Sequence, residues 1–535
     1  MLRQGPGQVQ FWFIAFGIGI AAGFAALAFR LGIAELQTFV YGTDDVMLAS
    51  HLETLPWTWR VLVPVAGGLV VGLILHFFTP DARARTPADV IEGAALGEGR
   101  VEIRAGLASA LASLITLSTG GSSGREGPVV HIGAMISTFV SRLINANGIT
   151  GRDLLGCAVA AAVSASFNTP IAGALFALEV VLRHFAVHAF APIVIASVAG
   201  TVVSRLNLGD VTEFYLPEGN VLEFYVELPA FVLLGLISGL VAVLLMKSIF
   251  WAEDVGDHVQ RSLRLPRWLR PAIAGAMLGG IAIWFPHIIG VGYETTSAAL
   301  TGRIAFWTVM VFAIVKGVAV TITMAGRMGG GMFSPSLMMG ALTGLAFGYA
   351  ATSIFPQVSG SETLYALAGM GAVAAAVLGA PISTTLIVFE LTGDWQTGLA
   401  VMVAVSMSTA LASRMVNMSF FLTQIERRGV HLAAGPQAWL LATFGVAKLM
   451  RPLEPDNEAL EQACWAMIEH GSYVDANSTL EAAMPIFDRI NPAFVPVVEL
   501  ADVDTPPVLK GMLYHVDALR AYNAALAATA HEEHS

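Results

Sequence analysis

The sequence predicts an all-α polytopic membrane protein that ends in a small α/β cytoplasmic tail. Of its 535 residues, 56% are hydrophobic and only 13% are Asp, Glu, Lys or Arg, and the mean hydropathy is +0.70. Soluble domains carry roughly twice that share of charged residues. Uncharged runs suited to the bilayer core recur along the chain. Clear examples are Phe11 to Phe29, Val61 to Phe78, Leu228 to Leu245, Pro271 to Ile289 and Gly398 to Ala412.

An internal repeat divides the apolar part into two halves. The segment from Pro128 to Ala134 matches that from Pro335 to Ala341 at an offset of 207 residues, and Pro170 to Glu179 matches Pro381 to Glu390 at an offset of 211. Duplicated halves are typical of transporters and related channels whose binding site lies where the halves meet. We therefore predict a membrane domain over residues 1–430, with halves at roughly 10–205 and 228–430.

The last part of the chain differs in composition. Residues 431–535 carry 14 acidic and 5 basic residues, which accounts for most of the net charge of −11. Strand patterns at Phe494 to Val498 and Leu509 to Tyr514 are followed by a helical pattern at Val516 to Ala528. We expect a small α/β unit here.

Basic residues predict the orientation in the membrane. Four arginines lie between Arg261 and Arg270, and Arg427 and Arg428 follow the last apolar helix, whereas the connection from Asp210 to Glu227 is acidic. Basic connections stay in the cytoplasm. We expect a multi-pass protein of a cell membrane, the bacterial inner membrane, with a cytoplasmic C-terminal tail.

The segment from Gly120 to Pro128 lies between two apolar runs and contains four glycines. Pro128 suits the first turn of a helix, and amides exposed at a helix N-terminus attract anions. Glu126 stands at this position. An intramembrane carboxylate is usually functional, so we predict that Glu126 occupies an anion site and leaves it when protonated. The alternative is a buried structural pair of Arg125 and Glu126.

The matching segment of the second half runs from Gly329 to Pro335. We expect free amides around Met332 and Phe333, at a second broken-helix N-terminus. Two such ends that converge at the midplane would bind an anion without a full positive charge. The alternative is a glycine-rich helix contact.

At this point the chain resembles the CLC family of chloride channels and proton-coupled chloride transporters. Gly124 to Pro128 is similar to the family's external-gate motif and Gly331 to Pro335 to its second filter segment, and Phe167 to Gly173 and Ala380 to Ile382 fit in order and spacing. The resemblance covers roughly residues 10–430. It implies an inverted repeat of about 17–18 tilted helices and a homodimer with one anion pathway per subunit. It also implies anion contacts from Gly124, Arg125, Gly127, Met332 and Phe333.

Three positions depart from the family pattern. Thr86 stands where the resemblance places the anion-binding serine, but without the flanking glycines, and Phe421 replaces the central tyrosine. Val180 stands at the inner proton site, where proton-coupled members often carry a glutamate. Glu179 and Glu390 are expected to cap or pair near helix ends instead of carrying protons.

The tail resembles a CBS module. Leu449 to Pro452 is similar to the opening of a truncated first copy, and Asp475 to Tyr522 to a more complete second one. Asp517 matches a ribose-contacting aspartate, but Tyr514 stands where Ser or Thr is usual. We expect a structural or dimer-contact tail that is dispensable for the pore and does not sense nucleotides.

The predicted function is passage of chloride, and of other small anions, gated by Glu126. A channel or weakly coupled transporter is favoured because of Val180, and a proton-coupled antiporter is the alternative. An organic-anion symporter is more remote, because polar residues for a larger ligand are lacking. Fluoride-specific relatives tend to replace the proline that is present here as Pro128. The helices carry no enzyme motif. We expect no cofactor, no metal and no nucleic-acid partner.

Overall fold

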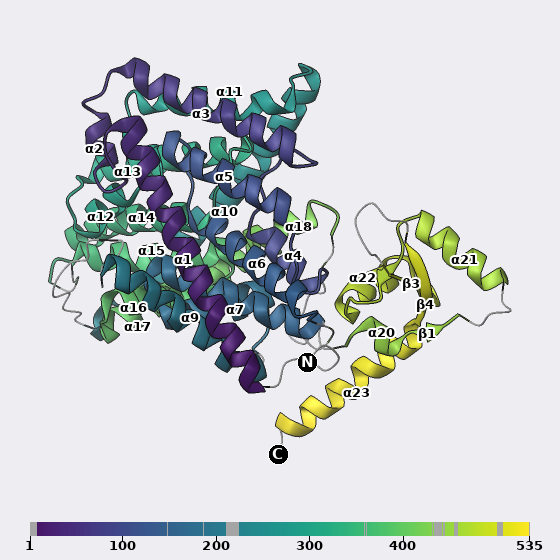
Figure 1. Cartoon of the computed structure of the whole chain (residues 1–535). Helices are drawn as coiled ribbons and strands as arrows, with labels where there is room; N and C mark the ends of the chain where they lie inside the picture. The colour runs from purple at the N-terminus through teal and green to yellow at the C-terminus, as the bar shows by residue number, and fades with distance from the viewer. Residues whose placement is uncertain are drawn as a thin grey trace.

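The chain is a helical membrane protein with a small sheet-containing C-terminal unit (Figure 1). The computed structural model describes residues 8–146, 148–185, 187–209, 214, 224–357, 359, 361–430, 432, 441, 444–453, 458–499 and 507–533. Eighteen α-helices lie between Gln8 and Glu426 in these ranges, and seven of the described helices are long and apolar enough to cross a membrane. The predicted fold class is confirmed.

The first half begins with the long helix α1. Its elements are α1 (Gln8–Tyr41), α2 (Leu48–Leu52), α3 (Trp57–Phe78), α4 (Pro87–Ala95), α5 (Ile103–Thr119), α6 (Glu126–Leu143), α7 (Gly148–Phe167), α8 (Pro170–Phe176), the π-helix η1 (Ala177–Leu182) and α9 (Val187–Leu208). The helix α8 therefore continues into η1 without an interruption.

The second half begins with the long helix α10. Its elements are α10 (Phe224–Ser262), the 3-10 helix η2 (Arg267–Leu269), α11 (Arg270–Ala282), the 3-10 helix η3 (Pro286–Ile288), α12 (Tyr293–Leu300), α13 (Phe306–Ala325), α14 (Phe333–Ile354), α15 (Glu362–Leu378), α16 (Pro381–Thr392), α17 (Trp395–Met415) and α18 (Phe420–Glu426). The repeated sequence segments open α6 and α14 in one case, and α8 and α16 in the other.

The core of each half is a helix rich in alanine and glycine. Every residue of α7 from Gly151 onward is buried, and so is every residue of α15 from Leu364 onward. Small residues let neighbouring backbones come close. A Cβ atom at Gly369 would lie 2.5 Å from the Gly340 carbonyl oxygen, so the contact between α15 and α14 requires glycine.

The C-terminal unit holds a four-stranded sheet in the order β1-β4-β3-β2. Its elements are α20 (Val446–Leu449), β1 (Arg451–Pro452), α21 (Glu458–Glu469), β2 (Val474–Asp475), α22 (Leu480–Ile490), β3 (Phe494–Glu499), β4 (Val508–Tyr514) and α23 (His515–Glu533). The two predicted strands and the final helix are confirmed, with starts within one residue. The start of the predicted tail, at 431 and 433–440, lies outside the described residues.

Two glutamates cap helices across the repeat. The Glu179 carboxylate in η1 accepts hydrogen bonds from the amides of Ile382 (2.9 Å) and Ser383 (2.8 Å) at the start of α16. The Glu390 carboxylate in α16 accepts hydrogen bonds from the amides of Ile171 (3.0 Å) and Ala172 (2.7 Å) at the start of α8. Each half thus caps a helix of the other, and the expected capping role is confirmed.

We expect Glu179→Ala and Glu390→Ala each to lower the stability of the protein by about 1 kcal/mol, the typical cost of losing a helix cap. Thermal unfolding of the purified protein in detergent measures this as a lower melting temperature. Glu53→Ala, which removes an exposed carboxylate from a loop, is the control. Unchanged melting temperatures in both cap variants would show that other groups replace the carboxylates.

Candidate anion site between two broken helices

The two halves of the protein meet at two glycines. The Gly124 amide donates to the Gly331 carbonyl, and the Gly331 amide donates to the Gly124 carbonyl, both at 2.7 Å. A Cβ atom at Gly331 would lie 2.7 Å from the Gly127 nitrogen, so a side chain does not fit there. The predicted pair of glycine-rich segments therefore lies side by side. The Gly124 amide is engaged in this contact and is not among the amides left open for an anion.

The bridge brings two helix N-termini together, because α6 begins at Glu126 and α14 at Phe333, each two residues beyond its bridging glycine. The amides of Gly127, Met332 and Phe333 have no acceptor among the described residues. Amides of a first helical turn lack intrahelical partners and carry the positive end of the helix dipole. This geometry suits a small anion.

Glu126 lies between the two helices and is 2% exposed. Its Oε1 atom accepts hydrogen bonds from Ser334 Oγ at 2.5 Å and from Tyr293 Oη at 3.4 Å. Its Oε2 atom has no hydrogen-bond partner within the described part of the chain. The Glu126 side chain therefore reaches from the first turn of α6 to the first turn of α14.

Arg125 is directed towards α7 and α12. Its Nη2 atom donates to the Ser166 carbonyl at 3.2 Å, and its guanidinium lies over the Tyr293 ring at 5.0 Å from the centroid. A cation over an aromatic face is stabilised by the ring quadrupole. The arginine thus holds Tyr293, which in turn donates to Glu126.

Sequence reasoning missed Tyr293, Ser334 and Lys316. Lys316 is fully buried in α13, and its Nζ atom donates to the carbonyls of Ile288 (3.2 Å) and Gly290 (3.3 Å), in the segment that leads to Tyr293. Lys316 is the only charged residue between Ile304 and Gly326. An isolated charge in an apolar run indicates a functional residue, so the sequence could have pointed to Lys316. No comparable sequence pattern points to Tyr293.

The anion-binding position predicted at Thr86 has its polar groups engaged. The Thr86 amide donates to Asp89 Oδ2 at 2.6 Å, and the Thr86 hydroxyl lies 3.2 Å from the same oxygen and 3.3 Å from Gln424 Oε1. Arg428 Nη1 holds the other Asp89 oxygen at 2.7 Å. A carboxylate of α4 itself therefore occupies the N-terminus of α4, and Thr86 is not open to an anion in this conformation.

The central position Phe421 and the inner position Val180 are both buried and apolar. Phe421 in α18 is 3% exposed and packs against Phe420, and Val180 in η1 is 6% exposed. π-Helical turns often occur at functional sites. The roles that the resemblance implies for both residues stay predictions.

Asp517, which matches a nucleotide-contacting aspartate, is engaged within the tail. Arg451 donates to both carboxylate oxygens, at 2.7 and 3.0 Å. The hydrogen bond from Arg451 holds the pKa of the Asp517 carboxyl below its ordinary value. The carboxylate thus already has a cationic partner.

Solved structures share this fold. A slow cyanobacterial Cl-/H+ antiporter aligns with a TM-score of 0.69 and 20% identity over 79% of this chain and 99% of the other. A eukaryotic CLC transporter aligns with a TM-score of 0.68 and 17% identity over 95% and 97% of the two chains.

Sequence comparison gives the family. A putative chloride channel protein, ClcB-like, of Ralstonia nicotianae is 31% identical over 391 residues, which cover 72% of this chain and 90% of that protein. Chloride channel protein CLC-f of Arabidopsis thaliana is 30% identical over 412 residues, covering 73% of this chain and 52% of that one. The family model described as voltage gated chloride channel matches residues 67–413. The chain therefore belongs to the CLC family of voltage-gated chloride channels.

Proposed function

We propose that the protein passes chloride across the membrane along a path that Glu126 opens and closes. One observation carries this proposal: the Glu126 carboxylate lies at the joined N-termini of α6 and α14, on the Ser334 hydroxyl. A carboxylate and a chloride ion compete for the same donors. Protonation removes the negative charge of Glu126, weakens its hold on Ser334 and leaves the open amides of Gly127, Met332 and Phe333 to the anion.

A channel or a weakly coupled transporter is favoured over a strictly coupled antiporter. A coupled exchanger must move protons between Glu126 and the inner side, and Val180 cannot bind a proton. The neighbouring Glu179 is engaged as the cap of α16, with hydrogen bonds to Ile382 and Ser383. The inner carboxylate closest in sequence to Val180 is therefore committed to structure, which supports the weaker coupling.

The tail is proposed to have a structural role on the cytoplasmic side of a cell membrane, in a homodimer. Glu481 of α22 is buried and lies within ion-pair distance of Arg183 (3.3 Å) and Arg152 (3.9 Å). Burial raises the pKa of the Glu481 carboxyl, and the two arginines oppose this rise. Arg183 directly follows η1, so the tail packs against the end of the helix that carries Val180.

Purified protein in chloride-loaded liposomes should release chloride down its gradient, because the open amides of α6 and α14 provide a site for a dehydrated anion. A chloride electrode outside the vesicles measures the release. Vesicles without protein are the negative control, and vesicles with a known chloride transporter are the positive control. If vesicles with this protein release no chloride while vesicles with the control transporter do, the proposed function is refuted.

Glu126→Gln should give chloride flux with little dependence on pH, because the amide mimics the protonated carboxyl. Ser334→Ala should move the pH of half-maximal flux upward, since the carboxylate loses its closest donor and is protonated more readily. Flux is recorded between pH 4 and 8. Glu53→Gln is the matched control. A wild-type pH profile in Glu126→Gln would make Glu126 structural.

A chloride gradient imposed on proteoliposomes should drive little sustained uphill proton movement, because Val180 offers no proton site. An internal pH dye records the movement. Val180→Glu should increase it, and Val180→Gln, with similar size and no titratable group, should not. Uphill proton flux at a fixed ratio to chloride in the wild type would instead support the antiporter.

A further inference from the structure

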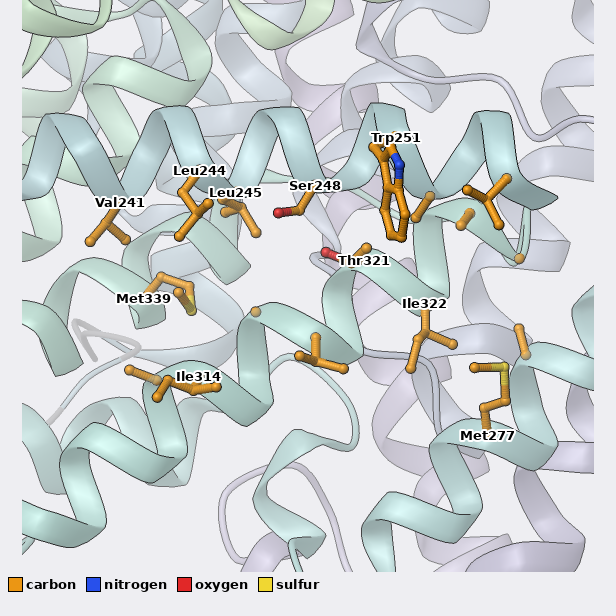
Figure 2. Close-up of a pocket in the computed structure, with 18 of the residues that line it drawn as sticks. Val241, Leu244, Leu245, Ser248, Trp251, Met277, Ile314, Thr321, Ile322 and Met339 are labelled. Atoms are coloured by element: carbon orange, nitrogen blue, oxygen red, sulfur yellow. The ribbon is translucent and has the colours of Figure 1, made fainter. Parts of the chain in front are cut away.

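An open apolar groove lies between four helices, away from the anion site. Residues of α10, α11, α13 and α14 line it, and its volume is about 1090 Å³. Figure 2 shows Ser248 of α10 and Thr321 of α13 facing each other across it, with Met339 of α14 and Met277 of α11 on its walls. The groove therefore runs between helices of the second half, and none of the residues of the anion site line it.

The lining of the groove suits a long apolar ligand. Large apolar side chains stand open to the surroundings, with Trp251 69%, Ile314 65% and Met277 53% exposed. Arg270, the one charged residue of the lining, is engaged by the carboxylate of Asp257 and by the Ala325 carbonyl. The walls thus have few polar groups that could bind a polar ligand, whereas a hydrocarbon chain would cover exposed apolar surface.

Positive charge is concentrated at one end of the groove. Gln260 and Leu265 line this end, and the exposed residues Arg261 and Arg264 flank them in the sequence, with exposed Arg267 close behind. None of these three arginines has a carboxylate partner among the described residues. A ligand that matches this end is anionic, while the rest of its length is apolar.

We propose that the groove binds an anionic phospholipid, with an acyl chain between α10 and α13 and its phosphate on the arginines of the segment 261–267. Basic pockets between membrane helices bind anionic lipid head groups in this way. The chain would lie beside Gly317, next to the buried Lys316, and beside Met339 on α14. The lipid would thus support the helix pair that positions Tyr293 and Ser334.

The test counts lipids retained by the full chain. Protein is extracted from vesicles of equal parts phosphatidylglycerol and phosphatidylcholine, and bound lipids are counted by native mass spectrometry. We expect retained phosphatidylglycerol in the wild type and about tenfold less in Arg261→Gln/Arg264→Gln. The matched control is Arg104→Gln/Arg414→Gln, which removes two exposed arginines that do not line the groove and should retain lipid as the wild type does.

Thr321→Trp fills the groove and should remove the retained phosphatidylglycerol, whereas Val202→Trp, on the exposed face of α9, should not. Circular dichroism and size-exclusion chromatography report whether each variant is folded. If Thr321→Trp does not fold, the Arg261/Arg264 variant alone provides the test. Equal retention of phosphatidylglycerol in the wild type and the Arg261/Arg264 variant would overturn the proposal. A change in the number of subunits per particle in Thr321→Trp, with unchanged lipid, would mean that a second copy of the chain fills the groove.

Discussion

The rest of the structure depends on the two hydrogen bonds between Gly124 and Gly331. Backbone polar groups inside a membrane must be satisfied within the protein, so a helix can break there only where another segment supplies partners. Here each broken helix supplies the partner of the other, at 2.7 Å. The lack of a side chain at Gly331 permits the approach. Because the two glycines are held together, the N-termini of α6 and α14 share one site, and a single carboxylate can reach both.

Two charged side chains near this site are buried, which makes their hydrogen-bond partners energetically important. Glu126 and Lys316 are almost fully buried, and a buried charge is costly unless polar groups compensate it. Glu126 accepts hydrogen bonds from the hydroxyls of Ser334 and Tyr293, and Lys316 donates hydrogen bonds to two backbone carbonyls. A carboxylate held by few donors can be displaced by a competing anion, which a fully compensated ion pair would not allow.

The repeat also appears in the structural caps. Glu179 and Glu390 occupy matching positions, and each satisfies the helix start of the opposite half. Their capping role was predictable from their place near helix ends, although their partners were not. The Thr86–Asp89 contact is different, since Thr-x-x-Asp before a helix resembles a capping box and is local in sequence. This local pattern therefore predicts that Thr86 is hydrogen-bonded to Asp89.

The sequence by itself determined the membrane fold, the repeated segments, the strands of the tail and the place of Glu126 at a helix start, because run length, repeat spacing and motif chemistry are local properties. Only the tertiary structure decided which groups surround Glu126. Ser334 and Tyr293 lie 208 and 167 residues away from it in the chain. The acceptors of Lys316 and the walls of the groove likewise come from separate helices. Such contacts depend on how the helices pack, and no local pattern encodes that packing.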